Sequence, residues 1–164
     1  MKIIIKWFGI ISIIFPTLCF GQLNLKLEIG SHIDKELLSD STNNIILTNP
    51  SQFRPYIDIT IDSVDYIIAF NEKTMEIKYI YTDDNNFRTI QGLKISSEIS
   101  LTKDEIIIYP GWNVYSKITD DGWYPIIGHN FTFENDSTTF ISKDTFKDLS
   151  TVTFKILGFS KGGN

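Results

Sequence analysis

The sequence of 164 residues contains a single cysteine, Cys19, and it lies close to the N-terminus. Past that point the chain has no thiol, so it cannot form a disulfide within one molecule. The same absence excludes a cysteine nucleophile, thiol redox chemistry and zinc sites of the cysteine type from the rest of the chain. We therefore expect the fold to be held by its hydrophobic core alone.

Histidine is nearly as scarce, with only His32 and His129. They do not have the spacing of a metal-binding pair, and the chain contains no Gly-x-Ser-x-Gly elbow and no glycine-rich phosphate loop after a strand. The sequence therefore nominates no catalytic residue, no metal ligand and no cofactor.

Positive charge is also in short supply: 15 basic residues stand against 20 acidic ones, a formal charge of −5. An acidic protein repels phosphate backbones, so we expect no nucleic-acid partner. Long hydrophobic runs are missing too. The apolar stretch from Trp7 to Phe15 is far shorter than the roughly 20 residues that a spanning helix requires, which predicts a protein that does not span a membrane.

The first 21 residues have the layout of a secretory signal peptide. Lys2 and Lys6 precede the apolar stretch, Pro16 ends it, and the small residues Cys19 and Gly21 lie three and one positions before Gln22. A lipoprotein signal or a retained anchor is the alternative. We predict cleavage after Gly21, which leaves residues 22–164 as one β-rich domain with a charge of −7, periplasmic or secreted.

Strand patterns dominate the remaining chain. Residues 56–61, 64–70 and 75–82 alternate between apolar and polar side chains and are separated by turn-rich gaps, which predicts a three-stranded antiparallel meander. Residues 112–118 and 123–127 flank an Asp-Gly turn and predict a hairpin, in which Pro125 favours an edge strand or an irregular register. A closing strand is expected at 151–159, followed by a flexible tail, with a further strand at 131–134 and a helical turn at 143–149.

Two short helices are expected as well. Thr102 to Glu105 has the spacing of a capping box, with Pro110 and Gly111 as a stop, and Ser31 is placed to cap a turn through Leu38. The segments 27–33 and 93–99 share Leu, Ile, Ser and Ile at the same spacing, through duplication or through chance in an isoleucine-rich chain. The expected fold is therefore α+β: mostly antiparallel β-sheet with two short helices on one face, with a duplicated unit as one of the two alternatives above.

The segment Val64–Ile95 shows a resemblance to known proteins, based on Phe87-Arg88-Thr89 followed by Gly92-Leu93-Lys94-Ile95. It resembles small exported bacterial proteins of unknown function and, more distantly, the duplicated helix-and-sheet β-lactamase-inhibitor-like proteins. The resemblance implies a fold and a compartment. It brings no active-site residue.

The acidic clusters Asp83–Asn86 and Asp120–Asp121 offer oxygen ligands of the kind that calcium prefers. Aspartate and asparagine are also the residues that turns use for their own backbone hydrogen bonds, and neither cluster has the alternating calcium-loop pattern. We interpret both clusters as turns.

Aromatic side chains gather in one segment of sixteen residues: Tyr109, Trp112, Tyr115, Trp123 and Tyr124. On a hairpin they can pack in the core, form a hot spot for a protein partner or make a platform for a sugar ring. With no catalytic motif in view, we predict a non-enzymatic module that binds another protein through these residues. An exported hydrolase whose carboxylates meet only in space and a glycan-binding module are the alternatives, and the oligomeric state stays open.

Overall fold

The computed structural model describes residues 27–38, 44–49, 52–109, 112–130 and 139–162. The predicted signal peptide, the predicted strand at 131–134 and the predicted helix stop at Pro110 and Gly111 lie outside these ranges. Ten strands and three 3₁₀ turns occur in the described part of the chain. The strands are β1 (Ile45–Asn49), β2 (Gln52–Ile61), β3 (Val64–Phe70), β4 (Ile77–Thr82), β5 (Glu98–Leu101), β6 (Ile106–Ile108), β7 (Asn113–Ser116), β8 (Tyr124–His129), β9 (Val152–Lys155) and β10 (Gly158–Gly162).

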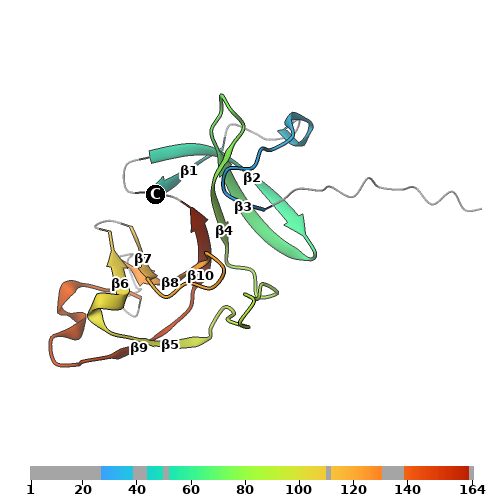
Figure 1. The fold of residues 1–164 in the computed structure, drawn as a ribbon. Coiled ribbons are helices and arrows are strands. Elements are labelled where there is room, and N and C mark those ends of the chain that lie inside the picture. The colour runs from blue at the N-terminus through green and yellow to red at the C-terminus, as the bar shows by residue number, and fades with distance from the viewer. Residues whose placement is uncertain (1–26, 39–43, 50–51, 110–111, 131–138, 163–164) are drawn as a thin grey trace, which may run out of the picture.

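Eight of the strands form one sheet in the order β1-β2-β3-β4-β10-β8-β7-β6, and β5 pairs with β9 in a second, two-stranded sheet. Every pair of strands in both sheets is antiparallel. Figure 1 shows β1–β3 in the upper part, β6–β8 in the lower left and the β5–β9 pair along the bottom, with β4 and β10 between the two groups. The last strand of the chain therefore occupies the middle of the large sheet.

The expected α+β fold with two helices is wrong. The described residues contain no helix longer than four residues, only the 3₁₀ turns η1 (Lys35–Leu38), η2 (Lys103–Glu105) and η3 (Lys143–Phe146). Thr102 and Glu105 do form the predicted capping box, and the Thr102 N–H donates to Glu105 Oε2 at 2.8 Å. The three isoleucines that follow, Ile106–Ile108, pair with β7 as a strand. Branching at Cβ favours the extended backbone, and the cap alone cannot carry a helix through this run.

The two predicted hairpin regions are confirmed. β2, β3 and β4 form the antiparallel meander, and Asp62 and Ser63 turn the chain with φ of 50° and 65°. β7 and β8 form the second hairpin, with Asp121 and Gly122 at φ of 51° and 75°. Two consecutive residues with positive φ match the right-handed twist of a hairpin, which explains the Asp-Ser and Asp-Gly pairs at these positions.

The C-terminal expectation is wrong in part. Residues 151–159 do not form one strand, because the chain breaks between β9 and β10, and 160–162 are not a tail but the second half of β10. Ser160 is buried between Tyr81 of β4 and Tyr124 of β8.

Pro125 does not lie on an edge strand either. β8 is an inner strand, flanked by β10 and β7. The ladder with β7 shifts register near Tyr115 and ends at Ile126, one residue short of Pro125. Of the two expectations for Pro125, the irregular register is therefore the one observed. Because the ladder with β7 stops before the proline, the missing N–H leaves no gap in that ladder.

The first of the two matching segments, 27–33, lies beside the beginning of β4. The Gly30 N–H donates to the Ile77 carbonyl at 2.9 Å, and the Ile77 N–H donates to the Ser31 carbonyl at 2.7 Å. Gly30 has a φ of 89°, which directs the chain into this pairing.

The second segment, 93–99, makes the same contacts just before β10. The Ser96 N–H donates to the Ile156 carbonyl at 2.8 Å, and the Ile156 N–H donates to the Ser97 carbonyl at 2.9 Å. Ser96, the counterpart of Gly30, also has a positive φ, 66°. Both segments thus pair with the chain that leads into one of the two central strands.

Two hydrophobic clusters form the core. The larger one covers one face of the sheet around β2, β3, β4 and β10 and includes Ile68, Ile80, Phe87 and Phe159. The smaller one fills the space between the β5–β9 pair and β6–β8, around Leu101, Val114 and Phe154. The larger cluster occupies one face of the large sheet. The site described below lies on the opposite face.

Among the residues that the structure describes, no helix has the length and apolar character that crossing a bilayer requires.

Asp84 fixes the loop after β4 and should make the fold sensitive to acid. Its Oδ1 accepts the Asn86 N–H at 2.7 Å and its Oδ2 accepts the Asp65 N–H at 2.9 Å, and these backbone hydrogen bonds lower the pKa of Asp84. A lowered pKa in the folded state means that the contribution to stability is complete above the unfolded pKa of about 3.9 and is lost as the pH falls through the folded pKa. We expect Asp84→Asn to lower the urea midpoint near neutral pH and to reduce its fall below pH about 4. Asp148→Asn is the control, because Asp148 is exposed and lies outside this loop, and it should change neither the urea midpoint nor its pH dependence. If the urea midpoint of Asp84→Asn fell with pH in parallel with that of the wild type, the prediction would be contradicted.

Candidate functional site

Four of the five aromatic residues singled out in the sequence line one hollow: Tyr109, Trp112, Tyr115 and Tyr124. The remaining lining residues come from other parts of the chain: Thr48, Asn49, Tyr79, Ile107, Ser160 and Gly162. We call this set the aromatic hollow. Five aromatic rings line this one depression, and they make it the candidate site.

The aromatic hollow lies between the two edges of the large sheet, and both edge strands contribute to its lining. Thr48 and Asn49 belong to β1 at one edge, and Ile107 belongs to β6 at the other. The central strands contribute Tyr79 and Ser160, which lie between these edges. The sheet must therefore curve strongly, with the hollow on its concave face. Strand twist accumulating over eight strands supplies such curvature.

The hollow is narrow. The space free of protein atoms is about 380 Å³, which includes solvent at the open mouth, and only about 30 Å³ of it is wide enough for the centre of a water molecule. That space suits one side chain or a small polar group.

Hydroxyl groups line the floor of the hollow. The Trp112 indole N–H donates to the Tyr115 hydroxyl at 2.8 Å. Burial raises the pKa of Tyr115, although hydrogen bonds with Tyr79, Trp112 and Asn113 oppose the shift. Burial also raises the pKa of Tyr79 well above its ordinary value. Both phenols are therefore neutral at physiological pH, and the hollow offers hydroxyl donors and acceptors without charge.

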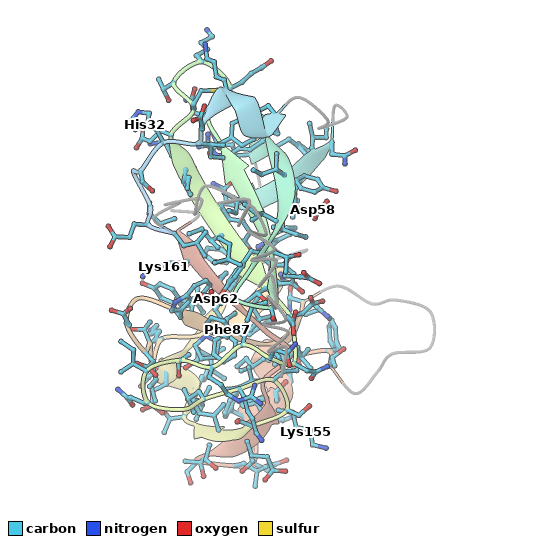
Figure 2. The ribbon with its side chains drawn as sticks, turned by 90° about the vertical axis from the view of Figure 1, so that its right-hand side faces the viewer. His32, Asp58, Asp62, Phe87, Lys155 and Lys161 are labelled. Atoms are coloured by element: carbon cyan, nitrogen blue, oxygen red, sulfur yellow. The ribbon has the colours of Figure 1, made fainter. Side chains whose placement is uncertain are left out.

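Trp123, the fifth predicted residue, is placed elsewhere. It is buried among the larger core cluster, with its ring 4.8 Å from that of Phe87 and with Lys161 Nζ 5.7 Å from its centre. Figure 2 shows Phe87 and Lys161 at mid-height in the molecule. Neighbouring residues of a strand point to opposite faces, so Trp123 and Tyr124 are separated by the sheet between them.

Tyr79 was missed as a site residue because of a bulge. Alternation places Ile77, Tyr79 and Tyr81 on one face, but the ladder with β3 shifts register between Ile77 and Tyr79. Ile77 therefore joins the core with Ile80, while the two tyrosines face the concave side. The positive φ of Met75 just before β4 marks irregular backbone there, but no simple sequence pattern announces it. Ser160 was missed because the tail was not expected to form a strand.

A second depression lies on the same sheet, over β2, β3 and β4. The space free of protein atoms there is about 760 Å³, which includes solvent at the open mouth, and its lining includes Asp58, Asp65, Tyr81 and Asp83. We call it the acidic hollow. The Thr60 hydroxyl donates to Asp65 Oδ1 at 2.6 Å, and Tyr81 interacts with Asp83. Burial, followed by the charge of Asp83, raises the pKa of Tyr81, so this phenol also stays neutral.

The two histidines and the predicted turn at Asp120–Asp121 lie outside both hollows, whereas Asp83 of the other predicted turn lines the acidic hollow. His129 Nδ1 lies 2.8 Å from Asn113 Oδ1, and His32 pairs with Glu76 in an isolated bridge. Asp120 is buried and its Oδ2 accepts the Gln91 N–H at 2.7 Å, a structural role in its turn. In the described ranges, no three histidine, aspartate or glutamate side chains are grouped so that they could hold a metal ion.

No family model, curated protein or solved structure matches the chain. The resemblance to small exported proteins therefore stays a prediction. A function must therefore be argued from the geometry of the two hollows.

Proposed function

We propose that this protein is an exported, non-enzymatic module that binds an extended segment of another protein at the aromatic hollow. The observation that carries the proposal is that residues of both edge strands and four of the five predicted aromatic residues line one depression. Tyrosine and tryptophan are the residues most often found at energetic hot spots, because they bury a large area at a small entropic cost. The volume of the hollow suits a single side chain, as expected for a site that anchors a chain rather than encloses a small molecule.

Edge strands supply the second element of this proposal. In the described part of the chain, β1 pairs only with β2 and β6 pairs only with β7, so each has an outer side with no strand beside it. An extended segment can add to such an edge through main-chain hydrogen bonds while a pocket selects its side chains. Thr48, Asn49 and Ile107 bring both edges to the rim of the hollow.

The test uses residues 22–164 and a displayed library of random peptides about eight residues long, which span about 26–29 Å when extended. We expect selected peptides to bind the wild-type protein and to lose at least about tenfold in affinity with Tyr124→Ala, the loss expected of a hot-spot residue. Ile90→Ala is the control, because Ile90 is 81% exposed and lines neither hollow.

Tryptophan emission provides an independent readout of the same binding. Trp112 lines the hollow and Trp123 is buried, so an occupant should shift the emission of a Trp123→Phe variant and leave that of a Trp112→Phe variant unchanged. Peptides that fail to bind the folded wild-type protein, or that bind Tyr124→Ala equally well, would contradict the proposal.

Glycan binding is the second candidate, and the hydroxyl groups of the hollow favour it. Tyr79, Tyr115 and Ser160 are largely buried, and Tyr79 hydrogen-bonds with the other two, so the lining combines neutral hydroxyl groups with aromatic rings, which suits a sugar. Titration of the same tryptophan variants with a panel of oligosaccharides separates the two candidates. Saturable binding of a sugar with no binding of peptides would favour the glycan.

A further inference from the structure

We propose that the bound segment is basic and that the part of it beyond the edge strands lies across the sheet from the aromatic hollow to the acidic hollow. An apolar side chain of the segment enters the first, and a lysine or arginine side chain enters the second. This inference rests on the proposed function and specifies the chemistry of the partner.

A single row of paired residues connects the two hollows. Asp58 pairs with Ile67, Ile67 with Tyr81, Tyr81 with Ser160, and Ser160 with Tyr124. Paired residues in antiparallel strands point to the same face, so these five side chains follow one line across β2, β3, β4, β10 and β8. The line begins in the acidic hollow and ends in the aromatic hollow.

Tyr81 forms the boundary between the hollows. It lines the acidic one, and its partner across the strands, Ser160, lines the aromatic one. Gly158 gives the Tyr81 ring room on β10, because a Cβ there would lie only 3.2 Å from Tyr81 Cε2. With no residue between them in this row, the two hollows are adjacent and one ligand can occupy both.

Charge decides which segment fits. Asp58, Asp65 and Asp83 line the acidic hollow, and no lysine, arginine or histidine lines either hollow in the part of the chain that the structure describes. Asp58 is exposed on β2 and projects outward in Figure 2. Its carboxylate has no hydrogen-bond or ion-pair partner among the described residues. A cationic side chain would meet three carboxylates there, with the Tyr81 ring available for a cation–π contact.

Distance sets the expected spacing within the segment. Adjacent strands lie about 4.8 Å apart, so the centres of the hollows, two to three strands apart, are separated by about 10–15 Å. An extended chain advances about 3.3 Å per residue, so three or four residues cover this distance. We therefore expect an apolar residue that fits the narrow aromatic hollow and a basic residue three or four positions apart.

The experiment sequences the peptides selected in the library and measures their affinity for charge variants. Asp58→Lys should weaken binding by about tenfold and should remove most of its salt dependence. Asp148→Lys is the matched control: it makes the same change in net charge at an exposed position that lines neither hollow, and it should have little effect. Raising the ionic strength from about 0.01 M to about 1 M shortens the Debye length from about 30 Å to about 3 Å and should weaken wild-type binding.

The outcomes separate this inference from the proposed function. Enrichment of the expected apolar–basic spacing, together with the loss at Asp58→Lys, supports the inference. Peptides that depend on Tyr124 but carry no basic residue at this spacing and bind Asp58→Lys normally would overturn it and leave the proposed function standing. Failure to select any peptide that depends on Tyr124 would overturn both.

Discussion

Replacement of Phe159 by alanine should lower the free energy of unfolding by about 3–5 kcal/mol, the usual loss for a buried phenylalanine. Phe159 is fully buried in β10, the strand that joins the two groups of strands in the large sheet. Its ring lies 5.0 Å from that of Phe87, which in turn packs against Trp123. Because domains of this size are stable by only about 5–15 kcal/mol, this loss would remove a large share of the total.

Urea unfolding followed by circular dichroism measures this loss, and Phe53→Ala is the matched control. Phe53 is 65% exposed on β2, so the same change of side chain should cost no more than about 0.5 kcal/mol there. If Phe159→Ala does not fold, Phe159→Leu keeps much of the volume and should give a smaller, measurable loss. Equal midpoints for Phe159→Ala and Phe53→Ala would show that β10 is not the centre of the core.

Gly128→Ala should destabilise the protein by about 2–3 kcal/mol, at the upper end of the cost of overpacking. A Cβ on Gly128 would lie 2.4 Å from the Thr139 carbonyl oxygen and 2.6 Å from Ile141 Cδ1. The first contact is with backbone, which cannot turn away as a side chain can. The segment 139–141 is held beside β8 by two hydrogen bonds with His129, which the added methyl group would strain.

A double-variant cycle identifies the cause of the Gly128 effect. Ile141→Val removes the Cδ1 atom but keeps Cγ1, 2.9 Å from the added Cβ, so it relieves part of the side-chain contact and leaves the clash with the Thr139 carbonyl. We expect Gly128→Ala to remain strongly destabilising in the Ile141→Val background, with a small interaction energy between the two substitutions. Full recovery in that background would place the clash in the side chain alone, and a loss below about 0.5 kcal/mol in the wild-type background would contradict the close packing.

Part of the site could be predicted from local sequence. The gathering of Tyr109, Trp112, Tyr115 and Tyr124 was evident, because consecutive strands that pair with one another, β6, β7 and β8, keep this segment together, although Trp123 in the same segment lies in the larger core cluster. Thr48 and Ser160 could not be predicted, since they reach the hollow only when β1 and β10 take their places in the sheet. The row from Asp58 to Tyr124 depends on four strand registers and has no counterpart in the linear order of residues.

The sequence by itself determined the short-range features: the alternation that makes β2 and β3 strands, the turns at Asp62–Ser63 and Asp121–Gly122, and the capping box at Thr102. These depend on backbone preferences and on neighbours a few residues away. Tertiary structure decided the rest. It made Ile106–Ile108 a strand rather than a helix, turned Tyr79 to the concave face and drew Ser160 into the middle of the sheet, because each outcome depends on pairing with residues far along the chain.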